Sequence, residues 1–166
     1  MHLVRLSKIA LTAVAGAFCL LVGYNNIVDY DSNLMFVQHV LAMDTVFLDN
    51  AVRASRAISD SRLHHLAYWI IIFAELSIGL VCAVGAARLA GAWKAPAGVF
   101  NQAKQLAILG LAAAFAFWFG AFLVVGAEWF QMWQSPSWNG QEGAFRFIGS
   151  IGLMLIFVSL EDKDPL

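Results

Sequence analysis

The chain has 166 residues, of which 61% are hydrophobic and 13% are charged. Soluble domains carry charges on about 25% of their residues, so this composition leaves too little polar surface for a water-soluble protein. The net charge of −1 lacks the basic excess that binding to nucleic acid requires. We therefore expect a single membrane domain covering residues 1–166, with the lipid bilayer and not nucleic acid as its partner.

Four apolar stretches are long enough to cross a bilayer as helices, which takes about 20 mainly apolar residues. The predicted spans cover residues 8–28, 64–87, 105–127 and 144–160, and the fourth reaches across only if it includes residues 143–146. Their unbroken runs of Ala, Leu, Gly and Phe lack the alternation of barrel strands. The sequence therefore predicts an all-α fold, a bundle of four transmembrane helices.

Small residues spaced four apart indicate where these helices approach one another closely. The pairs are Ala13 and Ala17, Ala83 and Ala87, and Ala112 and Ala116. We expect these alanines to lie at helix contacts.

The first span also has features of a secretory signal peptide, because Arg5 and Lys8 precede an apolar run. A cleavage site is missing, since Ala15 to Ala17 lies in the middle of the run and Phe18 precedes Cys19. We therefore expect this segment to be a retained membrane helix.

Positively charged residues near the ends of the spans predict the orientation, because cytoplasmic flanks are enriched in Lys and Arg. One side of the predicted bundle carries Arg5, Lys8, Arg88, Lys94, Lys104 and Lys163, whereas the other carries Arg53, Arg56, Arg62 and Arg146. This bias predicts that both termini are cytoplasmic and that residues 29–63 and 128–143 form outer loops.

The first outer loop contains an apolar stripe with helical spacing, which predicts an amphipathic helix. Its residues are Phe36, Val37, Val40, Leu41, Phe47 and Leu48, and Ser32 or Asn33 is suited to cap the start. Such a helix can lie on the outer leaflet, pack over the bundle or contact a partner protein.

The second outer loop is rich in tryptophan. Trp129, Trp133 and Trp138 lie close together, and Pro136 and Gly140 interrupt any helix there. Indole rings favour the headgroup layer of a bilayer. An aromatic belt is the simplest interpretation, and a recognition patch is the alternative.

Several segments resemble the bacterial family of predicted small integral membrane proteins, a family of unknown function. They are YNNIVDYDSNLMFVQHVLAMDTVF, HHLAYWIIIFAE, VVGAEWFQMWQSPSWNGQEGAFRF and the ending LIFVSLED, and the most specific parts are residues 39–47 and 129–147. The resemblance covers most of the chain and implies four spans, but it implies no reaction, cofactor or catalytic residue. Together with the charge bias, it predicts a multi-pass protein of the bacterial inner membrane.

Glu75 is the acidic residue predicted to lie near mid-membrane. An ionised carboxylate at that depth costs at least about 3 kcal/mol, so Glu75 should be protonated, paired or directed at a hydrated cavity. Glu75 and Trp118 form the candidate intramembrane polar site. A hydrogen bond between helices, a proton or cation relay and a contact to a partner subunit all remain open.

Three histidines, His39, His64 and His65, fall on the predicted outer side. A metal or haem site built from His39, Asp44 and one of the other two is geometrically possible, but no HxxxH, HExxH or Cys/His spacing supports it. We expect no metal and no cofactor. These histidines, Asp44 and the three tryptophans are the candidate residues for binding on the outer side.

The sequence lacks motifs for nucleophilic or phosphate chemistry, such as GxSxG or a glycine-rich loop ending in GK[ST]. We therefore expect a non-enzymatic protein, an accessory or scaffold subunit of a larger inner-membrane complex with other membrane subunits as partners. The alternative is a binder or carrier of a small molecule, such as a lipid, a quinone, a proton or a cation, that uses Glu75 inside the bundle.

Overall fold

The structure, a computed structural model, describes residues 2–164, and the regular elements among these residues are all helices. Four of the helices are long and apolar enough to cross a membrane: His2–Val28, Ser61–Gly91, Ala97–Trp129 and Gln141–Ser159. The predicted four-span helical fold is confirmed. Three of the helices extend beyond the predicted limits, since polar and charged residues continue each helix past its apolar stretch. The fourth begins at Gln141 and so includes the residues it needs to span.

Helices α1 (His2–Val28) and α4 (Ser61–Gly91) pack together along their length. Glycines allow this close approach, because a Cβ atom on Gly16 would lie 3.0 Å from the backbone nitrogen of Ala83. A Cβ atom on Gly85 would lie 2.6 Å from the backbone nitrogen of Ala107, so α6 (Gln105–Trp118) approaches α4 in the same way. The prediction from alanine pairs was largely wrong, since Ala13, Ala17, Ala87 and Ala116 are exposed.

The third span combines three helical segments, α5 (Ala97–Ala103), α6 and η1 (Phe119–Trp129). Segment η1 is a π-helix of 11 residues, and the backbone nitrogen of Phe130 donates to the carbonyl of Val125, five residues back, at 2.9 Å. Helices of this type are rare and are frequently found at functional sites. Helix α7 (Gln141–Ser159) packs against both α6 and η1.

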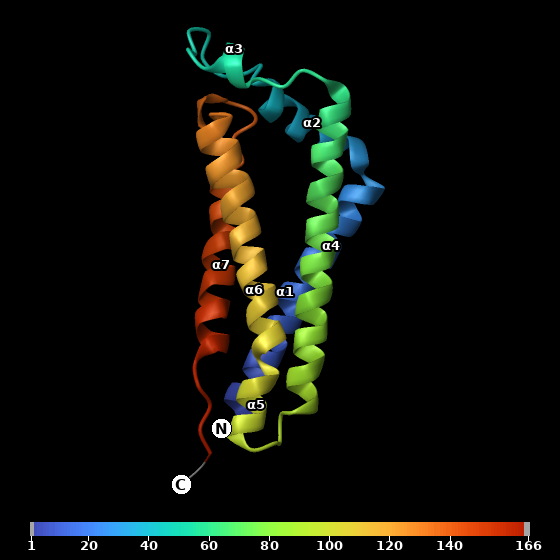
Figure 1. Ribbon diagram of the computed structural model, residues 1–166, viewed down its shortest axis with the longest axis vertical. Coiled ribbons are helices and arrows are strands. Elements are labelled where there is room, and N and C mark those ends of the chain that lie inside the picture. Colours follow the sequence, from blue (N-terminus) through green and yellow to red (C-terminus); the bar gives the residue numbers. More distant parts are fainter. Residues whose placement is uncertain (1, 165–166) are drawn as a thin grey trace.

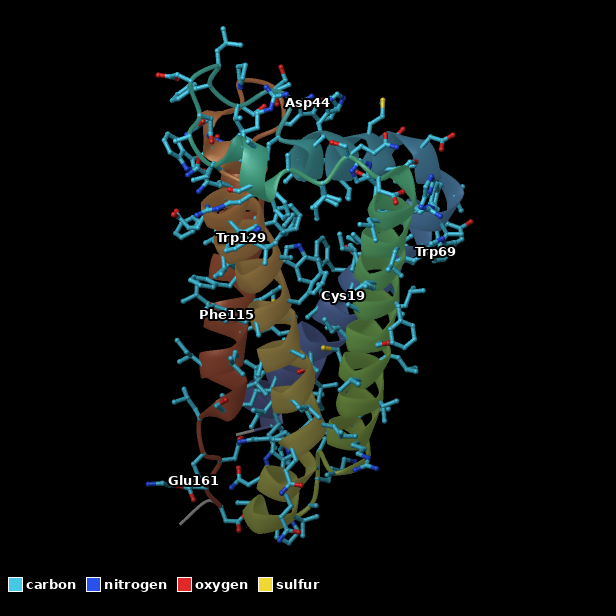
Figure 2. All side chains as sticks on the ribbon, turned by 45° about the horizontal axis from the view of Figure 1, so that its top comes forward. Cys19, Asp44, Trp69, Phe115, Trp129 and Glu161 are labelled. Atoms are coloured by element: carbon cyan, nitrogen blue, oxygen red, sulfur yellow. The ribbon has the colours of Figure 1, made fainter. Side chains whose placement is uncertain are left out.

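The bundle is closed at one end and splayed at the other (Figure 1). Helices α4 and α6 lie close together near the end where the chain begins and finishes, and they separate toward the opposite end. There α2 (Tyr30–Ala42) crosses over the separated helices, together with the short segments α3 (Arg53–Arg56) and η2 (Met132–Gln134). Asp44 and Glu161 mark these opposite ends in Figure 2. We call them the outer and inner ends, following the predicted orientation.

Helix α2 confirms the predicted amphipathic helix but is shorter than its apolar stripe. Leu34, Val37 and Val40 are buried, as expected for its inward face. The helix ends at Ala42 because Met43 adopts a left-handed backbone conformation with φ 49°. Phe47 and Leu48 therefore lie in the following loop, where Leu48 is 100% exposed, and the prediction that they continue the stripe was wrong.

The start of α2 also differs from the prediction. Only Asp29 separates α1 from α2, so the helix begins at Tyr30, upstream of the predicted cap. The hydroxyl of Ser32 donates to Asp29 Oδ1 at 2.8 Å and does not cap the helix. Asn33 instead donates to Asn26 Oδ1 on α1. The nearly continuous chain leaves no room for a separate capping turn.

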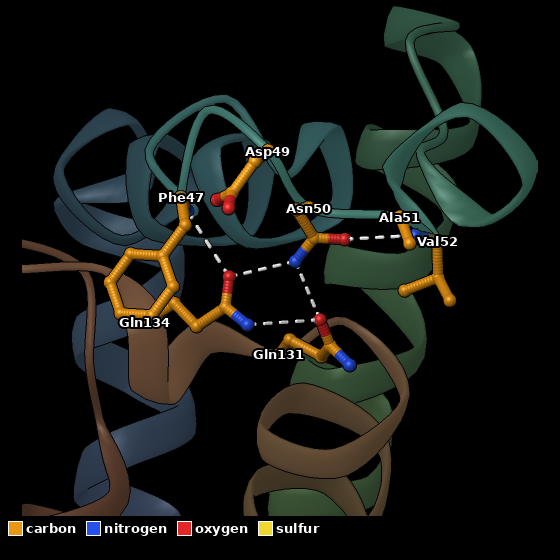
Figure 3. A pocket seen from close by; sticks show the side chains of 7 residues that line it. All are labelled: Phe47, Asp49, Asn50, Ala51, Val52, Gln131 and Gln134. Carbon is orange, nitrogen blue, oxygen red and sulfur yellow. Dashed lines mark hydrogen bonds between the residues drawn. The ribbon is translucent and has the colours of Figure 1, made fainter.

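The two outer loops form one unit through a network of amide side chains (Figure 3). Asn50 Nδ2 donates to the side-chain oxygens of Gln131 and Gln134, in the latter case at 2.7 Å. The backbone nitrogen of Phe47 donates to the same oxygen of Gln134 at 3.1 Å. The hydroxyls of Thr45 and Ser135 lie 2.7 Å apart and add a further link. These bonds hold the loop after α2 against the loop after η1.

The inner end is held by a buried cluster of charges around Asp162. Lys8 Nζ lies 2.6 Å from Asp162 Oδ2, Lys104 forms a second ion pair with the same carboxylate, and Arg5 Nε lies 3.7 Å from Oδ1. Burial alone would raise the pKa of Asp162, but the ammonium groups of Lys104 and Lys8 outweigh this effect and hold its pKa below the usual range. The cluster joins α1, the third span and the C-terminal segment.

Replacing Asp162 by Asn should destabilise the bundle by about 3 kcal/mol or more near neutral pH, because the buried Lys8 and Lys104 lose their anionic partner and Arg5 keeps only Asp164. Since the pKa of Asp162 is depressed in the folded state, the wild-type advantage is complete above about pH 4 and is lost as the pH falls through the folded pKa. Thermal unfolding in mild detergent, followed by circular dichroism, measures the difference. The exposed neighbour Glu161→Gln is the control, and equal unfolding midpoints for Asp162→Asn and wild type near neutral pH would contradict the prediction.

Candidate ligand-binding cavity

Glu75 lies near the middle of α4 and is only 4% exposed. Its Oε2 atom accepts a hydrogen bond from Asn26 Nδ2 on α1 at 2.7 Å. In residues 2–164 we find no salt bridge and no other hydrogen bond to the Glu75 carboxyl group. Of the arrangements that the sequence left open, the structure shows a hydrogen bond between helices.

Asn26 is the centre of a polar network that joins three helices. Its Oδ1 atom accepts from Asn33 Nδ2 on α2 at 2.8 Å, and its backbone carbonyl accepts from the Tyr68 hydroxyl on α4 at 3.1 Å. Asn26 and Tyr68 are both buried. Each polar group of Asn26 that faces a neighbouring helix is thus paired, as buried polar groups generally must be.

Sequence reasoning missed this network because Asn26 lies near the predicted end of the first span, at residue 28, where an amide needs no partner. The only signal was the presence of amides near the outer end of the first span, and their spacing does not single out Asn26, because Asn26 and Asn33 lie on different helices, α1 and α2. The register between α1 and α4, which depends on the glycine contacts, could not be read from the sequence.

A cavity of about 540 Å³ lies next to Glu75, within the range of small-molecule sites. One wall comes from α1, α2 and α4, and the other from α6, η1 and Phe147 of α7. Asn25, Asn26, Asn33, Tyr68 and Glu75 make a polar end, whereas most of the lining is apolar. The aromatic lining residues are Phe18, Phe36, Tyr68, Phe117, Trp118, Phe122, Phe130 and Phe147.

Trp118 lies on the wall opposite Glu75 and is almost completely buried. Its ring packs against Phe18 and Phe147, with centroid distances of 5.9 Å and 6.4 Å. The structure therefore brings the two predicted intramembrane residues to one cavity without a hydrogen bond between them in the described chain. The π-helix follows directly after Trp118 and contributes Ala121, Phe122, Val125 and Gly126 to the same wall.

The histidines of the outer side have separate partners. His39 Nδ1 lies 2.7 Å from Asp44 Oδ2, and the ring stacks on Trp138 at 4.4 Å. His64 is buried with Nε2 2.7 Å from the carbonyl of Ile58, whereas His65 pairs with the hydroxyl of Tyr30. The metal or haem arrangement of His39, Asp44 and a second histidine is therefore not assembled. Across residues 2–164, no group of three or more His, Cys, Asp and Glu side chains is placed to hold a metal.

The three outer tryptophans also lie in different surroundings. The guanidinium of Arg56 lies 4.6 Å above the ring of Trp129, and Trp133 meets the ring of Phe47 edge-on. Trp129 and Trp133 remain about half exposed, whereas Trp138 packs inward beneath His39. The outer candidates thus form local contacts and not a single site.

The fold and the cavity define an integral membrane protein that crosses the membrane with four helices. The chain belongs to the family described as predicted small integral membrane protein, DUF2165, which matches residues 4–161. No curated protein and no solved structure matches the chain. The family is one of unknown function, so the interpretation of the cavity rests on its own residues.

Replacing Asn26 by Leu should destabilise the protein by about 2 kcal/mol, because the buried Glu75 carboxyl group loses its hydrogen-bond donor and Asn33 loses its acceptor, whereas the backbone carbonyl of residue 26 still accepts from Tyr68. The adjacent change Asn25→Leu is the matched control, since Asn25 is exposed. Thermal unfolding in mild detergent compares the two variants. Equal unfolding midpoints for both variants would show that the network does not stabilise the fold.

Proposed function

We propose that this integral membrane protein binds or carries a hydrophobic small molecule in the cavity, with Glu75 as the polar anchor. The observation that carries the proposal is the combination of an aromatic cavity with one buried carboxyl group at its polar end. Small-molecule sites are usually apolar clefts in which a few polar groups fix the orientation of the ligand. Ionisable residues inside membrane spans are costly and commonly mark functional sites.

Two features of the cavity walls support this proposal. The first is the π-helix, whose wide turns place four residues on one wall. The second is access from the side, because Ile70 and Val125 line the cavity and are also 59% and 46% exposed on the surface of the bundle. A hydrophobic molecule dissolved in the bilayer can reach the cavity between α4 and η1.

The second candidate function is the accessory-subunit role predicted from the sequence. The observation that favours it is the apolar tip of the outer end, where Leu48, Phe47 and Trp133 are 100%, 53% and 47% exposed. Exposed apolar residues that cluster on a surface are typical of contacts with other proteins. This role does not exclude the cavity function, but it predicts that other polypeptides remain attached to the protein.

Native mass spectrometry of the protein, released from its own membranes in mild detergent, separates the two candidates. We use N-phenyl-1-naphthylamine as a neutral hydrophobic probe. Ala121→Trp fills the cavity with an indole ring, whereas Ala116→Trp places the same ring on an exposed position of the same span. We expect wild type and Ala116→Trp to bind the probe, and Ala121→Trp to bind it at least about tenfold more weakly.

Equal binding of the probe by both tryptophan variants would overturn the proposal, provided that circular dichroism shows both variants to be folded. Absence of probe binding to the wild type would overturn it as well. Co-purifying polypeptides at fixed stoichiometry would support the accessory role and identify its partners.

We also propose that the protein lies in the bacterial inner membrane with both termini in the cytoplasm. Arg88, Lys94 and Lys163 support this orientation, whereas Arg5, Lys8 and Lys104 are weaker support because they are buried around Asp162. In intact cells, a membrane-impermeant maleimide should label Leu48→Cys directly, but Lys163→Cys only after permeabilisation. The native Cys19 and Cys82 are buried and give little background. The reverse pattern would contradict the orientation.

A further inference from the structure

We infer that the molecule held in the cavity is a lipophilic cation, which pairs with the Glu75 carboxylate while its apolar groups pack against the aromatic walls. The inference rests on the proposed function and specifies the class of ligand. It follows from the charges around Glu75, from the hydrogen bond that Asn26 makes to its carboxyl group and from the aromatic lining of the cavity.

The cavity contains one acid and no base. Among the described residues that line it, none is Lys, Arg or His, and Glu75 takes part in no ion pair within residues 2–164. The buried cations Arg5, Lys8 and Lys104 lie at the inner end, where they already surround Asp162. A carboxylate in a low-dielectric site requires a counter-charge, and around Glu75 a cationic ligand can supply it.

The hydrogen bond from Asn26 prepares the carboxyl group for this role. Asn26 Nδ2 donates to Oε2 at 2.7 Å and so fixes the position of the carboxyl group at the polar end of the cavity. In the described chain, Oε1 accepts no hydrogen bond from the protein. One oxygen is thus oriented by the protein, and the other is left for a ligand.

The aromatic walls suit a cation better than an anion or a neutral molecule. The faces of Phe, Tyr and Trp rings carry partial negative charge and attract cations within about 6 Å of the ring centroid. Rings such as Phe18, Trp118 and Phe122 line the cavity together with five other aromatic residues. An anionic headgroup would meet the carboxylate of Glu75 with the same sign of charge.

Displacement of bound N-phenyl-1-naphthylamine tests the inference with two ions of matched size and opposite charge, tetraphenylphosphonium and tetraphenylborate. The protein is kept in an uncharged detergent. For each variant, we take the ratio of the tetraphenylphosphonium concentration to the tetraphenylborate concentration that displaces half of the probe. This ratio should be at least about tenfold lower in the wild type than in Glu75→Gln. Comparing this ratio between variants cancels the preference of the micelle for either ion.

Glu128→Gln is the matched control, because it removes one negative charge from an exposed side chain outside the cavity lining. It should keep the wild-type ratio. Retained binding of the neutral probe by Glu75→Gln shows that this variant still folds and keeps its cavity.

The outcomes distinguish the inference from the proposed function. If the neutral probe binds and is excluded by Ala121→Trp, but the ratio is the same in wild type and Glu75→Gln, the ligand is not a cation and the cavity function stands. If the neutral probe does not bind to the wild type, both fail. If Glu128→Gln raises the ratio as much as Glu75→Gln does, net charge and not Glu75 selects the cation, and this too would overturn the inference.

Discussion

The hydrogen bond between Asn26 and Glu75 joins the outer halves of α1 and α4 at the level of the cavity. Water does not compete for these groups inside a membrane, so each of them must find its partner within the protein. Asn33 and Tyr68 complete the arrangement from α2 and α4. As a result, α2 is held across the outer end and α4 stays with α1, while η1 stays with α7. The cavity is the space between these two pairs.

The two ends of the bundle are held by different forces. At the inner end, Gly85 and Gly110 let the backbones of α4 and α6 touch, and the charges around Asp162 fasten the C-terminal segment beneath them. At the outer end, hydrogen bonds among amide and hydroxyl groups join the two loops and leave the helices below them apart.

The length of the apolar stretches was sufficient to predict the four spans, because the bilayer requires a continuous helix and tolerates few charges within it. Glu75 stood out for the same reason, and Trp118 proved to lie on the same cavity. Asn26 could not be identified in this way, because an amide near the end of a span carries little energetic cost there. Only the positions of its neighbours show that it is buried. The end of α2 was missed because the left-handed Met43 is buried among residues distant in sequence, such as Phe130 and Met132, which the local pattern does not reveal. The close helix contacts depend on glycines, whereas four of the six alanines named for this role are exposed.

The apolar walls alone give the cavity little power to select a ligand. Lipid tails are as apolar as leucine side chains, so a cavity that is accessible from the bilayer can be filled by acyl chains at almost no cost. A ligand must therefore gain its preference over lipid from something that a lipid tail lacks. In this cavity the feature is the polar end, where Glu75 offers a carboxyl oxygen that the described chain does not use, within a lining rich in aromatic rings. For the ligand that we propose, charge should therefore matter more than shape, because the single carboxyl group is the one charged group that the described chain places at the cavity.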